Sequence, residues 1–490
     1  MFNNLAIKNN PIIFSLVLFV FIFLTSMYVT NGGLLNFDYG NAAVYCALFL
    51  FAINLLLNAK THGYFRVISF SFLFPFSFMI VYFQIAILEL LGIEMGYLFD
   101  YFIWFDRDLR SEILTVAALG LAAYTLGLFV TVNLEKQVSK GINLKYQTIK
   151  ILSILCIVSY IIFFVSSSNF RAGIYDPYAG TSAFTKYAVR LFELLILPAL
   201  ACNIFYIVKN HRNVKGVFSY LGLFYRPLLL ICIFSIVFSL YVGDRGPVLS
   251  YSLLLLSGYI IYIRKISALF ALGALIIGSI FFSFIYDART RTLDASYTER
   301  ASQAFSQTSG ITSLYYANLP EDIYIPDTVE LSLSVRTLSH VIGHVPEEYP
   351  YKYGHYSFQN LIAVIPGAAG VYNRVVYDGD FKYDGSANFI SYLLQGENRR
   401  YGDGTSVLAD IYLDFGVIGI VIAMYIFGFL IMRNEIINTQ KIPDLNISFI
   451  FFLQFFINGV YLARSSILLE VSTVLVAYAI ILLANSLSKD

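Results

Sequence analysis

Long runs of apolar residues recur from one end of the chain to the other, separated by polar segments. A helix needs about 20 mostly apolar residues to cross a hydrocarbon core roughly 30 Å thick. By that measure the pattern predicts about twelve membrane-spanning helices. Their ranges are 11–31, 41–58, 67–92, 113–132, 149–166, 187–208, 224–242, 247–263, 266–286, 406–432, 446–463 and 465–486. The pair at 224–242 and 247–263 is the weakest prediction, because the link between the two runs is very short.

One segment, residues 287–405, interrupts this pattern and is too long for a simple connector. Its many Tyr and Phe residues argue against disorder. Residues 328–344 and 386–395 repeat apolar positions at helical spacing and predict helices, and Asp327 or Thr328 is expected to cap the first. We therefore expect three parts: transmembrane helices one to nine in 1–286, the large loop in 287–405 and helices ten to twelve in 406–490.

Composition excludes a soluble domain of ordinary size. The chain is 58% hydrophobic and 13% charged, whereas a soluble domain is roughly 45–50% apolar and about 25% charged. The first apolar run is too long for a signal peptide and has no small-residue cleavage site, so it is expected to stay as an anchor. All four cysteines fall within predicted helices, so no disulfide framework is expected in the loop. The basic residues are dispersed, and no nucleic-acid partner is expected.

The distribution of basic residues predicts the orientation, because cytoplasmic loops carry an excess of Lys and Arg. With a cytoplasmic N-terminus, half of the 32 basic residues lie near inner helix ends. They are Lys8, Lys60, Arg66, Lys136, Lys140, Lys145, Lys150, Lys209, Arg212, Lys215, Arg226, Arg264, Lys265, Arg433, Lys441 and Lys489. The predicted fold is an all-α polytopic membrane protein of about 12 transmembrane helices, with both termini cytoplasmic and one large, partly helical extracytoplasmic loop.

Several arginines fall on the outer side, against this preference. They are Arg171, Arg245, Arg289, Arg291 and Arg464. One interpretation is a phosphate-binding site, because the planar guanidinium stays charged and binds phosphate oxygens in pairs. The alternative is that each arginine pairs with a local carboxylate, such as Asp244 or Asp287.

Two further sets of polar residues share one helix face each. Asp410 and Asp414 are four residues apart, so either could be a catalytic carboxylate or a favourable partner of the helix dipole. Arg336, His340 and His344 form one polar stripe on the predicted loop helix. The histidines could serve as a general base, although a solvated face explains them equally well. A metal site is not expected, because HEXXH and a third ligand are absent.

Three short motifs bear a resemblance to a known family. They are GDRGP at 243–247, DARTR at 287–291 and GDGTSVLADIYLDFGVIG at 402–419. Together with the late outer loop, they resemble the O-antigen (oligosaccharide repeat-unit) polymerases of the Wzy family. The resemblance implies a glycosyltransferase that joins undecaprenyl-diphosphate-linked oligosaccharide repeat units into O-antigen or capsule-like polysaccharide. It would act at the outer face of the bacterial cytoplasmic (inner) membrane, without a metal or other cofactor.

The resemblance also suggests roles for residues. Arg245, Arg289 and Arg291 would bind diphosphate, and Arg171, Arg336, Arg464 and Asp414 are further candidates for substrate binding. The catalytic base stays open among His340, His344, Asp244 and Asp410. Expected partners are the lipid-linked oligosaccharide, membrane lipid and a chain-length-regulating co-polymerase.

Three other functions fit the same layout. An O-antigen ligase would need a second acceptor in addition to the lipid-linked repeat unit. A lipid-linked oligosaccharide flippase or other transporter would place polar residues and broken helices near the membrane midplane, whereas here the charges gather toward one face. A non-catalytic assembly protein would lack a cavity that joins the outer leaflet to the loop.

Overall fold

The computed structural model describes residues 11–31, 39–62, 69–93, 102–129, 141–171, 182–211, 213–264, 328–365, 367–399, 402–440 and 443–488. Within these ranges the secondary structure is helical, with no strand. Nine helices there are long and apolar enough to cross a membrane. The chain is therefore an all-α polytopic membrane protein, as its hydrophobic pattern predicts.

Helices lie at eleven of the twelve predicted positions. Two of them are not among the nine long helices: α10 (Arg226–Val242) has 17 residues and α21 (Ile447–Asn458) has 12. At about 1.5 Å per residue, α21 is only about 18 Å long, and it cannot cross a hydrocarbon core by itself. The remaining predicted helix, 266–286, lies outside the described residues, so the number of spans stays a prediction.

The chain divides into two compact units. The first comprises residues 1–135, 311–433 and 459–469, and the second comprises 136–310, 434–458 and 470–490. Both units contain segments that are far apart in the sequence. The division of the chain into parts at residues 287 and 405 stays a prediction.

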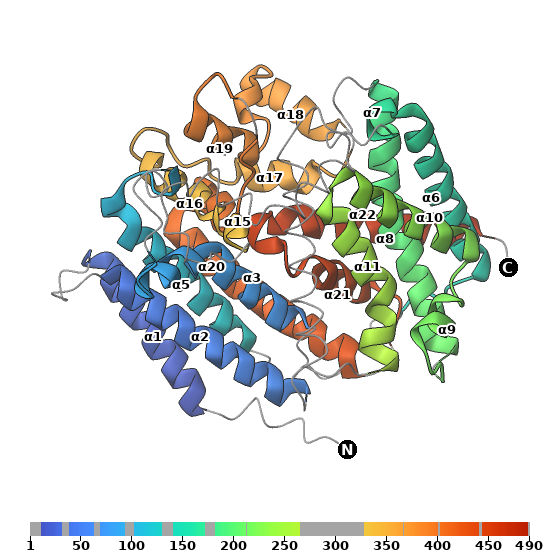
Figure 1. Ribbon diagram of the computed structural model, residues 1–490, viewed down its shortest axis with the longest axis horizontal. Coiled ribbons are helices and arrows are strands. Elements are labelled where there is room, and N and C mark those ends of the chain that lie inside the picture. The colour runs from blue at the N-terminus through green and yellow to red at the C-terminus, as the bar shows by residue number, and fades with distance from the viewer. Residues whose placement is uncertain are drawn as a thin grey trace, which may run out of the picture. The chain divides into compact units, whose positions relative to one another are not determined.

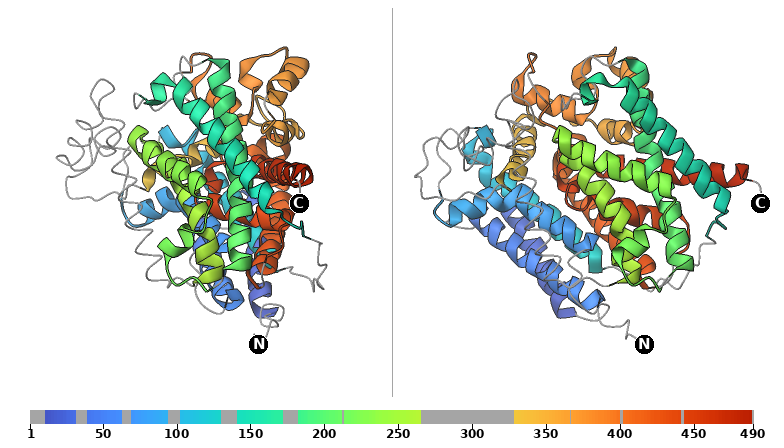
Figure 2. Two further views of the ribbon diagram at one scale, coloured as in Figure 1. Left: turned by 90° about the vertical axis from the view of Figure 1, so that its right-hand side faces the viewer. Right: turned by 45° about the vertical axis from the view of Figure 1, so that its right-hand side comes forward.

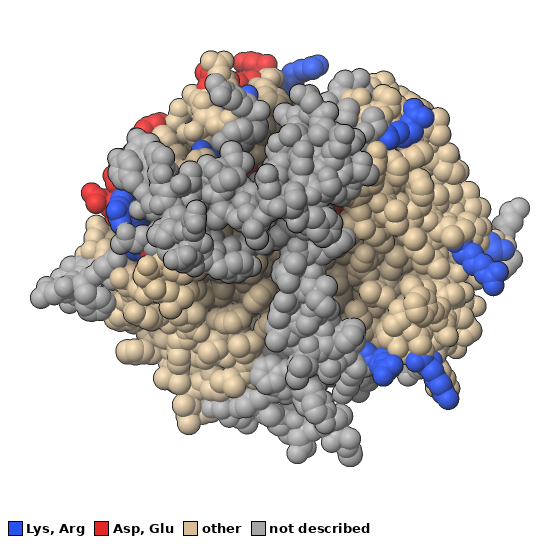
Figure 3. Space-filling view, viewed as in Figure 1, with Lys and Arg blue, Asp and Glu red and all other residues tan. Residues whose placement is uncertain are grey.

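In the first unit, four helices pack side by side (Figure 1): α1 (Pro11–Val29), α2 (Tyr39–His62), α3 (Phe70–Leu90) and α5 (Arg110–Phe129). The 3-10 helix η1 (Arg107–Leu109) precedes α5. In the view of Figure 3, the surface over α1 and α2 is uncharged, as lipid contact requires, and the unit's visible charges gather over its loop helices and the start of α5.

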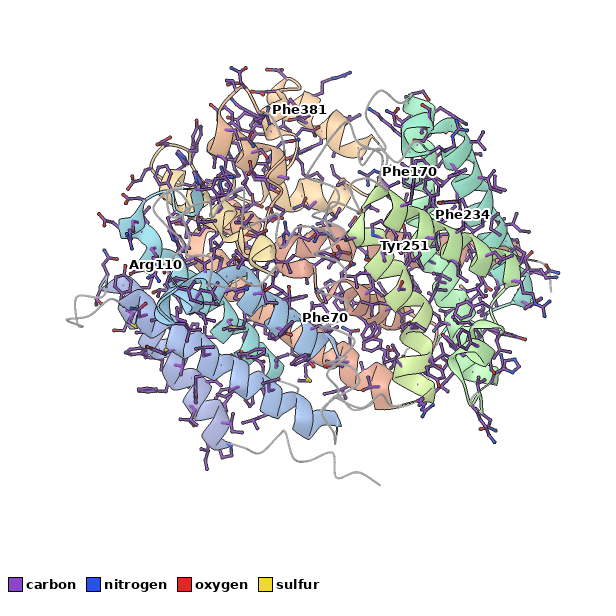
Figure 4. The ribbon with its side chains drawn as sticks, viewed as in Figure 1. Phe70, Arg110, Phe170, Phe234, Tyr251 and Phe381 are labelled. Carbon is purple, nitrogen blue, oxygen red and sulfur yellow. The ribbon has the colours of Figure 1, made fainter. Side chains whose placement is uncertain are left out.

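The helix α20 (Val407–Gln440) packs against this layer through glycines and aromatic rings. A Cβ atom on Gly428 would lie 2.1 Å from the carbonyl oxygen of Tyr124, so the backbones of α5 and α20 touch there. The ring of Phe427 meets the rings of Phe70 and Phe74 edge-on, at 5.7 and 5.3 Å between centroids. Figure 4 shows Phe70 on α3, within the packed helices.

Five short helices of the predicted loop gather at one end of this layer (Figures 1 and 2): α15 (Val329–Ser332), α16 (Val335–His344), α17 (His355–Ile362), α18 (Ala368–Tyr377) and α19 (Ser386–Gln395). The predicted helix at 386–395 coincides with α19, and that at 328–344 is divided into α15 and α16. Thr328 lies at the N-cap position of α15, but its hydroxyl accepts no hydrogen bond from the amides of that helix. It accepts one from the side-chain amide of Gln84 at 2.7 Å instead. Asp327 lies outside the described residues. The sequence pattern predicted neither α17 nor α18.

The second unit contains α6 (Tyr146–Ser166), α7 (Ser168–Arg171), α8 (Ala183–Asn210), α9 (Val217–Leu221), α10, α11 (Arg245–Gly258), α21 and most of α22 (Ile467–Leu487). The helix α11 continues as a π-helix, Tyr259–Ile263. The very short link before α11 is feasible because Gly243 adopts a φ of 84°, which ends α10 in a left-handed turn. Aromatic contacts fill this unit, among them Phe170, Phe234 and Tyr251 (Figure 4).

Candidate functional site

The first part of α20 is set apart by a break at Gly416. This glycine has a φ of 62° and a ψ of −156°, which an L-residue with a side chain rarely adopts. The carbonyl groups of Leu413 and Asp414, in the turn before the break, accept hydrogen bonds from the amides of Lys352 and Tyr353 at 2.9 and 3.0 Å. These amides satisfy carbonyl groups in the last turn of a helical segment, which have no partner within the segment itself. Residues 407–415 therefore form a short helix that carries both Asp410 and Asp414.

Asp414 fixes the start of α17. Its buried carboxylate accepts hydrogen bonds from the amides of Tyr356 and Ser357, at 3.2 and 2.7 Å. Both amides belong to the first turn of α17, whose N–H groups have no partner within their own helix. Asp414 thus caps α17 from a distant point in the sequence, and both of its oxygens are engaged.

Asp410 lies one turn earlier, at the centre of a buried polar cluster. Its carboxylate accepts hydrogen bonds from the side chains of Thr405 and, at 3.1 Å, Asn360. The same amide nitrogen of Asn360 donates to the hydroxyl of Ser466 at 2.9 Å. Among the described residues, no basic side chain lies within 4.0 Å of the Asp410 carboxylate. Its neighbours are neutral donors, whereas Asp403, Glu348 and Asp380 of the loop each lie beside a basic side chain.

The loop that leads into α20 is held on two sides. From α16, Arg336 pairs with Asp403 at 3.1 Å, and the hydroxyl of Thr337 donates to that of Ser406 at 2.9 Å. From α19, Gln395 donates to the other oxygen of Asp403 at 2.5 Å. Burial raises the pKa of Asp403, and the hydrogen bond from Gln395 and the charge of Arg336 oppose this shift. These contacts leave Arg336 engaged in an ion pair.

The two histidines of α16, His340 and His344, lie beside Phe105. The ring of His344 is 4.5 Å from that of Phe105 and the ring of His340 is 5.4 Å away. Burial, with the nearby positive charge of Arg336 and with His344, lowers the pKa of His340 to about 3. His340 is therefore neutral near pH 7 and a weak base. The Nδ1 atom of His344 lies 2.9 Å from a carboxylate oxygen of Glu348.

The remaining predicted site residues are distributed over the chain. Arg464 ends the 3-10 helix η4 (Leu462–Arg464) in the first unit, two residues before Ser466. Asp244, Arg245 and Arg171 belong to the second unit, where Asp244 caps α11 by accepting a hydrogen bond from the amide of Gly246 at 3.2 Å. Arg289 and Arg291 lie outside the described residues. The convergence of these arginines with the histidines stays a prediction.

The sequence interpretation did not identify Asn360 or Ser466. Each lies far from Asp410 along the chain, in a segment without a recognisable motif. It also did not identify Tyr82 of α3, whose hydroxyl accepts a hydrogen bond from the amide of Leu408 at 3.1 Å. Only the folded chain brings these groups to the start of α20.

These features define a multi-pass membrane protein with a buried polar site where a broken helix meets a layer of loop helices. The chain belongs to the O-antigen polysaccharide polymerase Wzy family, whose profile matches residues 12–490. The predicted resemblance is thereby confirmed. Membership gives the chain a polymerase role in O-antigen synthesis, glycosyltransferase-type chemistry and a lipid-linked oligosaccharide substrate. No curated protein and no solved structure matches the chain.

Proposed function

We propose that the protein joins undecaprenyl-diphosphate-linked repeat units at the outer face of the inner membrane, with Asp410 as the general base. The observation that carries this proposal is the surroundings of the Asp410 carboxylate. It is buried, oriented by Thr405 and Asn360, and has no positive charge beside it among the described residues. A carboxylate held in this way keeps its capacity to accept a proton, because no ion pair competes for it.

In the proposed reaction, Asp410 accepts the proton of a sugar hydroxyl on the acceptor glycan. The hydroxyl oxygen forms a bond to the anomeric carbon of the donor glycan, and the bond from that carbon to the donor's lipid diphosphate breaks. The leaving diphosphate takes the bonding electron pair and gains negative charge, which cationic side chains can stabilise. No metal or cofactor is included in this scheme.

The other candidate bases are less suited to this role. His340 is a weak base at neutral pH, because its pKa is lowered to about 3. Asp244 caps α11 in the second unit, and His344 pairs with the exposed Glu348 and, within the described residues, has no hydrogen bond to the polar cluster around Asp410. Asp410 is therefore the candidate that the local geometry supports best.

For the diphosphate, we propose Arg464 as a first contact, because it lies two residues from Ser466, which shares the Asn360 amide with Asp410. Arg245, Arg289 and Arg291 remain proposed diphosphate ligands, and Arg171 remains a proposed substrate contact. Arg336 would act by positioning, through Asp403 and the start of α20. Asp414 would likewise position α17. A co-polymerase that sets chain length is a proposed partner.

Asp410→Asn tests the proposal, because the substitution keeps the size of the side chain and removes its basicity. The rate of polymer formation should fall by about 10²–10⁴-fold, the usual contribution of a general base. Purified protein would be given lipid-linked repeat unit as its only glycan, and the product ladder would be measured over time. A ladder from the native protein distinguishes a polymerase from a ligase, which needs another acceptor.

The matched control is Asp380→Asn, on an exposed loop carboxylate that pairs with Lys382. It should leave the ladder unchanged. Asp410→Asn protein that is folded, inserted in the membrane and as active as the native chain would exclude Asp410 as the base.

A further inference from the structure

The loop helix α18 exposes three valines beside Arg374 and buries a polar residue. It exposes Val371 and Val375, which are 65% and 78% accessible, and also Val376. Its buried residue is polar: the amide of Asn373 donates to the carbonyl oxygen of Asp380 at 3.0 Å. A helix on a water-facing surface carries its apolar residues on the buried side. The outer face of α18 is therefore unsuited to water.

Contacts with α17 fix the orientation of this face. The hydroxyl of Tyr372 lies 3.1 Å from Nδ1 of His355, and their rings stack with centroids 5.3 Å apart. On its other side, the Tyr372 ring meets Phe358 at 5.1 Å. Phe358 and Ile365 are themselves exposed and extend the apolar surface beyond α18. The side chain of Phe381, also exposed, lies at the outer edge of the loop helices (Figure 4).

This surface continues a row of apolar residues on α20. Ile418, Ile422 and Ile426 are exposed at helical spacing on a helix that is long and apolar enough to cross the membrane. The row reaches Phe415, whose ring lies against Gly354, where an added Cβ atom would be 3.2 Å from it. Gly354 is the residue from which α17 begins. Phe415 therefore joins the exposed isoleucines of α20 to the start of α17, from which the apolar surface continues onto α18.

We propose that the outer face of α17 and α18 lies in the interfacial region of the bilayer, in contact with acyl chains. The face is defined as Phe358, Ile365, Val371, Val375 and Val376. Lipid is the proposed occupant because the surface is continuous with the lipid-facing row of α20, and short helices with one apolar face bind in this region of a bilayer. The exposed Arg374 has a long side chain that can extend its charge toward the headgroups.

One consequence rests on the proposed function. The helix α17 exposes Phe358 toward lipid and, two residues later, directs Asn360 to Asp410. Since a helix with its side chains is about 10 Å wide, the polar cluster would lie roughly one helix width from acyl chains. A lipid-linked substrate could then reach Asp410 sideways from the bilayer.

The test uses the single tryptophan of the chain, Trp104. In a Trp104→Phe background, V375W would be reconstituted as full-length protein in phosphatidylethanolamine and phosphatidylglycerol vesicles containing phosphatidylcholine brominated near the top of its acyl chains. The brominated lipid should quench the fluorescence of V375W strongly, and aqueous iodide should quench it weakly. The matched control, E397W on an exposed polar residue of the same loop, should show the opposite order.

Iodide quenching of V375W equal to that of E397W would overturn the proposal. So would protection from both quenchers, which would mean that protein covers the face. If Trp104→Phe does not fold, a fluorophore on V375C in a Cys46→Ser chain gives the same comparison, because the other cysteines are buried. Adding Asp410→Asn should leave the quenching of V375W unchanged. Loss of polymer formation therefore tests the proposed function, and the quenching tests lipid contact independently of it.

Discussion

At the scale of single residues, two ion pairs in the loop differ in their surroundings. Arg336 and Asp403 are 11% and 8% accessible at their side chains, and Gln395 completes their contacts. The guanidinium of Arg336 also lies 3.9 Å from the centre of the Phe102 ring. Lys382 and Asp380 form a looser pair at 3.3 Å, and the Asp380 side chain is 46% accessible. The first pair anchors the loop before α20, and the second lies at the surface.

Removing one partner should therefore have different effects at the two pairs. We expect Asp403→Ala to lower the free energy of unfolding by about 3–5 kcal/mol, because it leaves the Arg336 charge buried without its partner. Asp380→Ala should lower it by less than about 1 kcal/mol. Unfolding in mixed micelles with increasing denaturing detergent measures both. Equal effects would show that Arg336 is solvated in the native protein.

The sequence named Asp410 as one of four candidate bases, and it gave no information about the surroundings of this carboxylate. Asp410 and Asp414 have the same spacing and the same predicted face, so no local signal separates them. Folding gives them different partners: backbone amides of α17 for Asp414, and the side chains of nearby Thr405 and distant Asn360 for Asp410. Such partners depend on tertiary contacts, which the residues flanking an aspartate do not encode.

At the scale of secondary-structure elements, the break in α20 determines where the loop attaches. A Cβ atom on Gly416 would lie 2.9 Å from the hydroxyl oxygen and 3.0 Å from the adjacent ring carbon of Tyr351. The φ of 62° with a ψ of −156° also disfavours any side chain at this position. The backbone conformation favours glycine here, and the Tyr351 side chain would have to move to admit a Cβ atom. The sequence pattern predicted only an uninterrupted helix.

We expect Gly416→Ala to destabilise the protein by at least about 1–3 kcal/mol, the usual range for such backbone strain. The steric conflict with Tyr351 adds to this effect. The control is Gly370→Ala in α18, where nothing lies within 4 Å of an added Cβ atom. That substitution should be neutral or stabilise by up to about 1 kcal/mol. Thermal unfolding in mild detergent measures both, and an unchanged melting temperature for Gly416→Ala would contradict the strained geometry.

Element length and the orientation of the apolar face decide which helices could be predicted. A run of about 20 apolar residues forms a membrane-spanning helix more readily than any other structure. The hydrophobic pattern therefore located the long helices correctly. The short helix α19 was also found, because its buried residues Phe389 and Ile390 follow the usual pattern. The helix α18 was not found, because its valines face outward and its buried residue is Asn373.

At the scale of the whole molecule, the described candidate site belongs to the first unit. Its parts come from α3, from the loop helices, from the start of α20 and from Ser466, which follows η4. Farther along α20, Gly127 and Gly428 let the backbones of α5 and α20 come into contact, which holds α20 against the helix layer of this unit. The proposed active site lies at the start of α20. A polymerase can use it only if this end of the helix faces the compartment that contains the lipid-linked glycans.

The orientation therefore gives a prediction for the intact molecule. The excess of Lys and Arg at one set of helix ends predicts that both termini lie in the cytoplasm and the loop outside. In a chain depleted of its native cysteines, an impermeant maleimide added to intact spheroplasts should label E397C in the loop and not N213C between α8 and α9. Both positions are exposed, and both should react after permeabilisation, which controls for accessibility. Labelling of N213C alone in intact spheroplasts would invert the topology and place Asp410 at the cytoplasmic end of α20.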